Sequence, residues 1–168
     1  MSQLLALSIS VAVLGAVWAY LALGPLAPYV LVWAGFIAAG CFFAAGGDNT
    51  ALIKTLAGII YGAVVGWITL VVIDKVPVPG LGTFWPALVV GFFVFFLVIV
   101  ASIEPLSVVP ANVYGFAMVV AYTLSANKLA AVTEASALNP LVLVILSAIA
   151  GVILGYLMGQ LAGVLKAK

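Results

Sequence analysis

The side chains that could carry out chemistry are few in this sequence. Its 168 residues include no histidine, one cysteine and four acidic residues. Histidine is the commonest general base and a frequent catalytic metal ligand. The carboxylates are scattered, and no metal-ligand spacing, phosphate-binding loop or G-x-S-x-G motif occurs. We therefore expect no enzyme activity, no catalytic residue, no metal site and no cofactor.

Asn112, in the sequence VPANVYGF, is the first candidate for contact with a small polar molecule. Its surroundings are apolar, and a polar group in such a segment is costly and therefore informative. Pro110 has no amide hydrogen, so an irregular helix there would present a free carbonyl beside the Asn112 amide. The alternative is that Asn112 makes a hydrogen bond that only holds two helices together.

Glu104 is the second candidate, because it precedes Pro105 at the boundary between two apolar segments. A carboxylate at the edge of the membrane-spanning segments could attract a cation or relay a proton. An ordinary turn residue, or a favourable charge near a helix N-terminus, explains the same position equally well.

Two Gly-Phe pairs, each with a further aromatic residue nearby, form the third candidate set. Its members are Trp33, Gly35, Phe36, Tyr114, Gly115 and Phe116. Paired rings from two helices would form a narrow apolar constriction that excludes hydrated ions and passes small uncharged molecules. In that arrangement the glycines let the helices approach. Core packing is the alternative for the two phenylalanines, and anchoring at the membrane interface is the commoner role of such aromatic residues.

The composition indicates which elements must position these residues. Hydrophobic residues make up 68% of the chain and charged residues 5%, and the mean hydropathy is +1.46. A soluble domain needs far more polar surface. The sequence therefore predicts an all-α integral membrane protein whose first partner is the lipid bilayer. The net charge of +1 argues against a nucleic-acid partner.

Six apolar segments are close to the roughly 20 residues that cross a bilayer, and breaks rich in glycine and proline separate them. Their predicted bounds are Leu4–Leu23, Pro28–Ala45, Thr50–Ile73, Thr83–Ile103, Leu106–Leu124 and Asn139–Leu165. We expect one membrane domain over residues 1–168, with both termini on the same side.

The lysines indicate which side that is. The side of the termini carries Lys54, Lys166 and Lys168, and the opposite side carries Lys75 and Lys128. An excess of positive charge favours the cytoplasm, so both ends are expected there, by a margin of one lysine.

The sequence also contains a weak internal repeat. A shift of about eighty positions aligns GPLAPYVLVWAGF with EPLSVVPANVYGF, and a shift of about ninety-three aligns the two glycine-rich segments described below. The two units cover about residues 4–73 and 83–165. Each holds three spans, an odd number, so the second enters the membrane in the opposite orientation. This predicts an inverted 3+3 repeat, an arrangement found in many transporters.

Glycines recur every fourth residue in two of the predicted helices: Gly58, Gly62 and Gly66 in one, and Gly151, Gly155, Gly159 and Gly163 in the other. Small residues let helices approach closely inside a membrane. The simplest prediction pairs these third and sixth helices along the pseudo-twofold axis. Contacts between subunits, or a passage for a solute, are the alternatives.

The stretch VWAGFIAAGCFFAAGGD, residues 32–48, follows a leucine-rich first span. With it, nearly the whole chain resembles the small bacterial inner-membrane family typified by YcdZ, a family of unknown function. The resemblance implies a multi-pass protein of the bacterial inner (cytoplasmic) membrane. It implies no substrate, so no functional residue is carried over from it.

Three functions follow as expectations. The first is a channel or facilitator for a small neutral or weakly charged solute, such as urea, ammonia or a short amide, because the spans contain almost no charge. The second is a structural or accessory subunit of a larger membrane complex. The third is a small ion- or proton-coupled transporter, for which Glu104 and Asn112 are the only obvious groups. A homo-oligomer is expected for the first, since small-pore proteins often assemble in that way.

Overall fold

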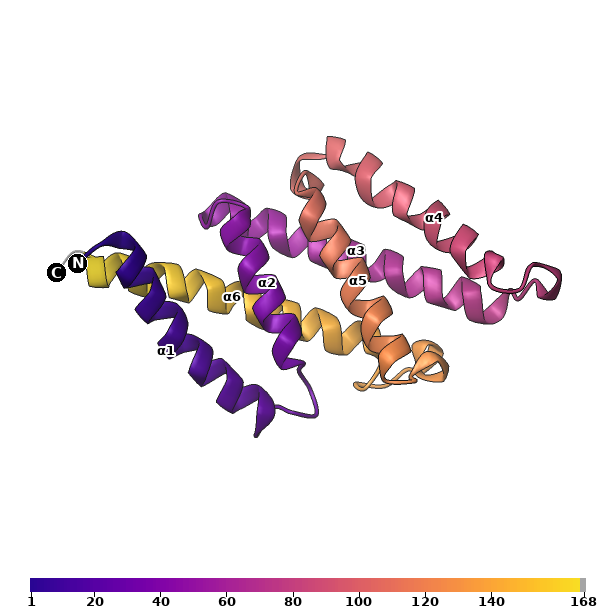
Figure 1. The fold of residues 1–168 in the computed structure, drawn as a ribbon, viewed down its shortest axis with the longest axis horizontal. Coiled ribbons are helices and arrows are strands. Elements are labelled where there is room, and N and C mark those ends of the chain that lie inside the picture. Colours follow the sequence, from indigo (N-terminus) through magenta and orange to yellow (C-terminus); the bar gives the residue numbers. More distant parts are fainter. Residues whose placement is uncertain (167–168) are drawn as a thin grey trace.

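A computed structural model describes residues 1–166, and within that range it contains helices and no strand (Figure 1). The predicted all-α class is confirmed. The six α-helices are α1 (Gln3–Leu23), α2 (Val32–Ala44), α3 (Asn49–Lys75), α4 (Phe84–Ile99), α5 (Val109–Ser125) and α6 (Pro140–Lys166). Four short 3-10 helices lie between them: η1 (Pro79–Leu81), η2 (Val100–Ser102), η3 (Glu104–Leu106) and η4 (Leu129–Thr133). Each α-helix corresponds to one predicted segment.

Polar side chains fix where three of the helices begin. The Asp48 carboxylate accepts a hydrogen bond of 2.7 Å from the amide of Ala51 at the start of α3. The Asn139 side-chain oxygen accepts one of 2.9 Å from Leu141 at the start of α6. Ser2 caps α1 in the same way. Each cap satisfies an amide that has no partner within its own helix.

Pro110 lies in the first turn of α5, and this corrects the expected irregularity at that residue. α5 begins at Val109 and is continuous from there to Ser125. A proline in the first turn removes an amide that has no intrahelical partner in any case, so the helix is not disturbed. The irregular backbone lies just before it, in η2 and η3.

Four helices are long and apolar enough to cross a membrane: α1, α3, α6, and α4 together with η2. The other two are shorter. α2 has 13 residues and α5 has 17, which at 1.5 Å per residue gives about 20 and 25 Å, against a hydrocarbon core of roughly 30 Å. The described chain has the character of a membrane-spanning protein, but the six full spans expected from the sequence go beyond what these lengths show.

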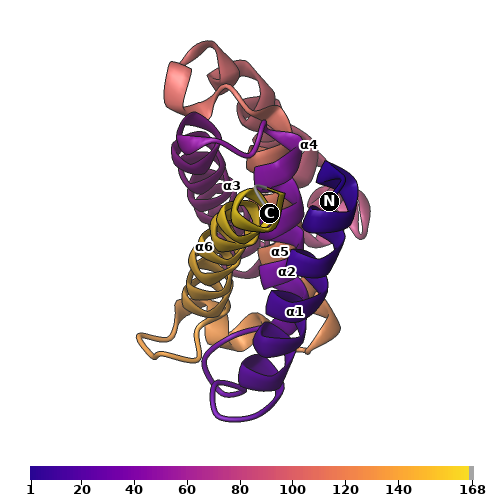
Figure 2. The same ribbon diagram turned by 90° about the vertical axis from the view of Figure 1, so that its left-hand side faces the viewer.

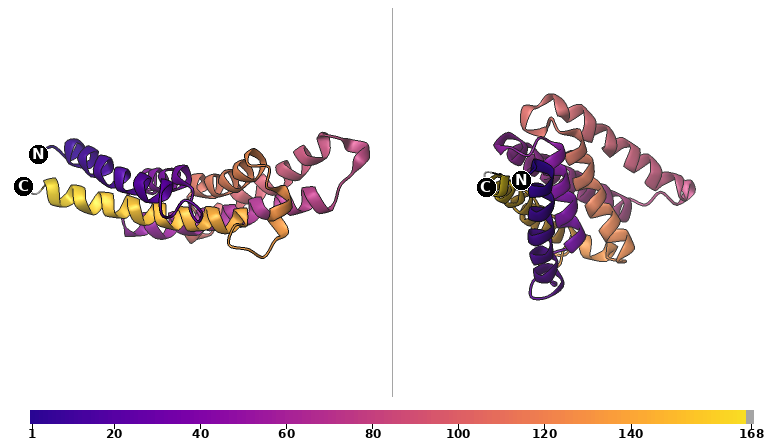
Figure 3. Two further views of the ribbon diagram at one scale, coloured as in Figure 1. Left: turned by 90° about the horizontal axis from the view of Figure 1, so that it is seen from below. Right: turned by 60° about the vertical axis from the view of Figure 1, so that its left-hand side comes forward.

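The helices form a thin, elongated body. α1 and α4 lie at opposite flanks, and α2, α3, α5 and α6 lie between them (Figures 1 and 3). The start of α1 and the last turn of α6 lie side by side at one end of the molecule (Figure 1), the end that faces the viewer in Figure 2. There the Lys166 ammonium donates a hydrogen bond of 3.4 Å to the Gln3 side chain. Lys168, which entered the expected charge balance, lies outside the described residues.

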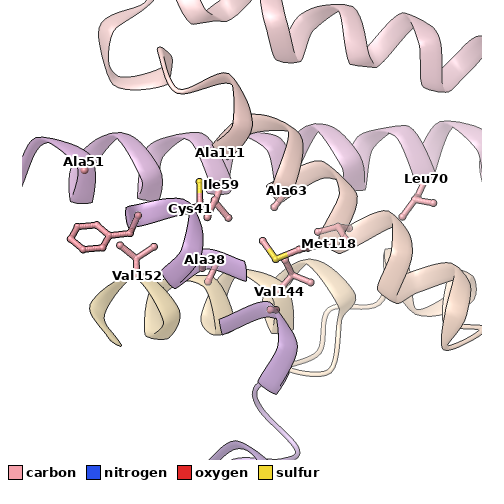
Figure 4. Packing of buried hydrophobic residues seen from close by; sticks show 14 of the residues in the cluster. Ala38, Cys41, Ala51, Ile59, Ala63, Leu70, Ala111, Met118, Val144 and Val152 are labelled. Atoms are coloured by element: carbon pink, nitrogen blue, oxygen red, sulfur yellow. The ribbon is translucent and has the colours of Figure 1, made fainter. Parts of the chain in front are cut away.

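The main core is built by the four central helices. Small and branched side chains from α2, α3, α5 and α6 meet there, and Phe42 and Ile59 are completely buried (Figure 4). α4 differs from the others because it buries only Val89 and Leu97. It is therefore the helix with the least support from the rest of the bundle.

The glycine-rich helices do not use these glycines to pack against each other, which corrects the simplest expectation. The glycines of α3 contact α5, and Gly151 and Gly155 of α6 contact α2. A Cβ atom at Gly155, for example, would lie 3.2 Å from the Ala39 Cα atom of α2. Gly159 has only the Phe43 ring at 4.0 Å, and Gly163 meets nothing within 4 Å. Each glycine-rich helix therefore packs on a different short helix, α3 on α5 and α6 on α2.

Candidate functional site

The interface between α3 and α5, which we call the α3–α5 seam, brings two backbones into direct contact. A Cβ atom at Gly62 would overlap the Asn112 carbonyl oxygen, and one at Gly115 would overlap the Ile59 carbonyl oxygen. At Gly66 the added atom would lie 2.9 Å from the Phe116 carbonyl oxygen. Only glycine permits this approach, because any other residue would place a side-chain atom inside the partner backbone.

Asn112 lies in this seam and has no exposed surface. Its side-chain amide nitrogen donates two hydrogen bonds, of 2.9 Å to the Leu97 carbonyl and 3.0 Å to the Leu106 carbonyl. Leu97 lies in the last turn of α4 and Leu106 ends η3. The Asn112 amide therefore holds the irregular connection between α4 and α5 in place.

The side-chain oxygen of Asn112 has no hydrogen-bond partner, although it is buried. Its orientation is fixed by its own amide group, because exchanging oxygen and nitrogen would press the oxygen against two carbonyl oxygens. It points toward Gly58, where an added Cβ atom would lie 2.7 Å from it. An acceptor left unpaired in an apolar interior costs about 1–3 kcal/mol.

An ion pair lies at the outer end of the seam. The Lys54 ammonium lies 2.6 Å from the Glu104 carboxylate, with side-chain exposures of 23% and 80%. Lys54 precedes Gly58 by four residues, one helical turn or about 6 Å. Both residues line a surface hollow of about 260 Å³, together with Asn49, Thr50, Ile53 and Pro105. The candidate site thus has two parts, this hollow with its ion pair and, about one helical turn along α3, the buried Asn112 oxygen beside Gly58.

The interface between α2 and α6, the α2–α6 seam, is built differently. A Cβ atom at Gly151 would overlap the Gly35 carbonyl oxygen, so the backbones again touch. Its buried polar group is Ser147, which accepts a hydrogen bond of 2.7 Å from the Leu31 amide and donates one of 2.6 Å to the Leu143 carbonyl. The Ser147 hydroxyl is fully satisfied.

Three further buried hydroxyls also make no hydrogen bond, those of Ser10, Thr55 and Thr123. A hydroxyl in a helix can turn toward the carbonyl one turn earlier. The oxygen of Asn112 has no such choice while its nitrogen is held. Thr55 lies beside the Cys41 thiol, a weak hydrogen-bonding group. These hydroxyls therefore indicate a ligand less strongly than Asn112 does.

The two phenylalanines of the predicted constriction contact different parts of this chain. Phe36 is 41% exposed and lies over α1, where a Cβ atom at Gly15 would be 3.3 Å from its ring. Phe116 is 8% exposed and packs with Val65 and Leu97. The two rings have different neighbours because the two helices turn these positions toward different partners. Trp33 and Tyr114 lie at the surface.

The sequence reasoning placed Glu104 correctly at a boundary but missed its partner. Lys54 and Glu104 both fall on the membrane side assigned to the termini, one in the third span and one between the fourth and fifth. Their opposite charges on the same predicted side of the membrane were the sequence feature from which this ion pair could have been predicted. Within residues 1–166, no group of three His, Cys, Asp or Glu side chains is arranged to hold a metal ion.

Comparison with known proteins assigns a family and no more. The family described as "Protein of unknown function (DUF1097)" matches residues 8–163, and the chain belongs to it. The match confirms an uncharacterised family and leaves YcdZ as its typical member untested. No curated protein and no solved structure matches the chain.

Proposed function

We propose that this DUF1097 protein is a membrane channel or facilitator for a small neutral or weakly charged solute, of the urea, ammonia or short-amide class. The observation that carries the proposal is the unpaired, buried oxygen of Asn112. Unlike the unpaired hydroxyls of the bundle, this oxygen cannot turn toward a nearby backbone group while its nitrogen is held, so it keeps the cost of an unmade hydrogen bond. A solute that passes the α3–α5 seam would supply the missing partner.

The contrast between the two seams supports a functional reading of Asn112. Both seams bring backbones into contact through glycine, so both meet the same packing requirement. In the α2–α6 seam the buried Ser147 hydroxyl is satisfied, whereas in the α3–α5 seam the Asn112 oxygen is not. The tethering of Leu97 and Leu106 accounts for the Asn112 nitrogen, but it leaves the oxygen without a structural role.

The proposed architecture is six crossings arranged as an inverted 3+3 repeat, α1–α3 and α4–α6. It is supported by the exchange of partners, since α3 packs on α5 just as α6 packs on α2. α1 and α4 occupy opposite flanks, where a half-turn about the viewing direction of Figure 1 would place them if it related the two proposed repeat units. The shorter α2 and α5 would cross with the help of the apolar residues that flank them or of a locally thinned bilayer.

We place the protein in the bacterial inner membrane with both ends in the cytoplasm. The contact between Gln3 and Lys166 supports ends on one side. If each helix crosses, the Lys54–Glu104 pair lies on that side as well. The solute would then enter from the cytoplasmic hollow and meet the ion pair before Asn112.

The accessory-subunit function is the second candidate, and α4 is the helix that offers a face for a partner. This helix buries only two of its side chains and exposes a row of large ones: Phe84, Leu88, Phe92, Phe95 and Ile99. Lipid covers such a face as well as a partner does. Co-purification of a different subunit in fixed ratio would favour the accessory function, and a homo-oligomer alone would favour transport.

Purified protein in liposomes tests the proposal. We expect stopped-flow light scattering to show faster entry of urea or acetamide than into empty liposomes of the same lipid. The same liposomes should not admit sodium ions faster. If every small neutral solute enters both preparations at the same rate, the transport function is wrong.

A further inference from the structure

We infer that the solute must donate a hydrogen bond, because Asn112 offers it an acceptor and no donor. The inference rests on the proposed function and names the chemical class that the same site selects. An asparagine side chain has one acceptor oxygen and two donor hydrogens. Both donor hydrogens are used, by the carbonyls of Leu97 and Leu106. Only the oxygen is free.

The surroundings of the oxygen supply no competing donor. Its neighbour across the seam is Gly58, which presents no side chain. The adjacent backbone groups of α3 and α5 are hydrogen-bonded within their helices. The exceptions are the amides of Ala111 and Asn112 at the start of α5, which donate to the Val108 carbonyl at 2.9 and 3.4 Å. A passing N–H or O–H group is therefore the one kind of partner that would satisfy this atom.

The contact with Gly58 also explains why the atom is closed off in this structure. α3 and α5 must separate by about the width of a solute before the oxygen is reached. Because Gly58 has no side chain, only its backbone must move away before a solute reaches the oxygen. The ion pair at Lys54, one turn outward, lies across the entrance.

The class that fits is a small molecule with an amide, urea, ammonia or hydroxyl donor. A molecule of the same size that only accepts hydrogen bonds would leave the oxygen unpaired throughout its passage. It would also bring its own acceptor against the Asn112 oxygen. Selectivity of this kind is strong, because a buried group left without a partner costs more than the net energy of one hydrogen bond.

The test compares acetamide, which carries two N–H donors, with dimethyl sulfoxide, which is similar in size and carries none. The measured quantity is the ratio of their permeabilities in proteoliposomes, each after subtraction of the value for empty liposomes. For the wild-type protein we expect a ratio of at least about five in favour of acetamide, the effect of one hydrogen bond.

Two variants distinguish the loss of the Asn112 side chain from the general effect of losing a tethering amide. Asn112→Leu removes both, and we expect the ratio to fall to about one. Asn139→Ala is the matched control, because the Asn139 nitrogen also tethers carbonyls, those of Ala131, Val132 and Glu134, but its oxygen is already paired with Leu141. This control should keep the wild-type ratio even where its stability falls.

The outcomes are distinct. Equal protein-dependent entry of both solutes into wild-type liposomes overturns the inference and leaves the transport function standing. No entry of either solute removes the transport function and the inference with it. The wild-type ratio needs no substitution, so it decides the matter even if Asn112→Leu does not fold.

Discussion

At the scale of the residue, the α3–α5 seam combines two opposite requirements. The glycines remove every side-chain atom so that two backbones can touch, while Asn112 brings a large polar group into the same contact. The first arrangement stabilises the bundle through close packing. The second costs free energy, because the Asn112 oxygen stays unpaired.

The packing requirement makes Gly62 the most sensitive glycine. In Gly62→Ala the new methyl group would overlap the Asn112 carbonyl, so the helices must separate. We expect the free energy of unfolding in detergent to fall by about 2–3 kcal/mol, a typical cost of overpacking. Gly40→Ala is the control, since nothing lies within 4 Å of an added Cβ atom there. Equal stability of the two variants would show that the seam does not hold the backbones in contact.

At the scale of the element, the start of α2 depends on α6. Leu31 precedes α2, and its amide donates a hydrogen bond to the Ser147 hydroxyl of α6, 116 residues away along the chain. This bond fixes where the shortest α-helix begins and joins the two halves of the molecule. It gives the α2–α6 seam a polar contact that needs no ligand.

Ser147→Ala should therefore destabilise the protein. The Leu31 amide would lose its partner within the protein, at an expected cost of about 1–2 kcal/mol. Chemical unfolding in detergent measures this, with Ser125→Ala as the control because the Ser125 hydroxyl is exposed and makes only a long bond of 3.5 Å. A Ser147→Ala protein as stable as the control would mean that water or another group reaches Leu31.

The helices could be predicted from the sequence, but their contacts could not. An apolar run of fixed length between glycine- and proline-rich breaks is set by the bilayer, so the helix positions follow from local composition. A face of glycines predicts a close contact without naming its partner, which is why α3 was expected to meet α6. The directions of Phe36 and Phe116 depend on how α2 and α5 are rotated about their axes, and contacts with distant parts of the chain set that rotation.

At the scale of the whole molecule, the proposed inverted repeat requires six membrane crossings with both chain ends on one side. The adjacency of Gln3 and Lys166 and the alternating course of the helices support this. Neither α2 nor α5 reaches about 30 Å by itself, so the residues that flank each helix must complete its crossing. Topology must therefore be measured directly.

Single cysteines introduced into a Cys41→Ala background provide that measurement. We expect Ser2→Cys and Ser102→Cys to react with a membrane-impermeant thiol reagent from one side of the membrane. Gly80→Cys and Ser136→Cys should react only from the other. If the Ser102→Cys and Gly80→Cys variants are labelled from the same side, α4 does not cross the membrane, and the inverted repeat is wrong.

The most direct test of the account is to lock the entrance of the α3–α5 seam. A carbodiimide joins an amine and a carboxylate that are in contact, as Lys54 and Glu104 are at 2.6 Å, without adding atoms between them. After this treatment we predict that the acetamide permeability of wild-type proteoliposomes falls to that of empty liposomes. Treated Glu104→Gln protein, which cannot form the link, should keep its permeability. Undiminished permeability of protein shown by mass spectrometry to carry the Lys54–Glu104 link would contradict a pathway past Asn112.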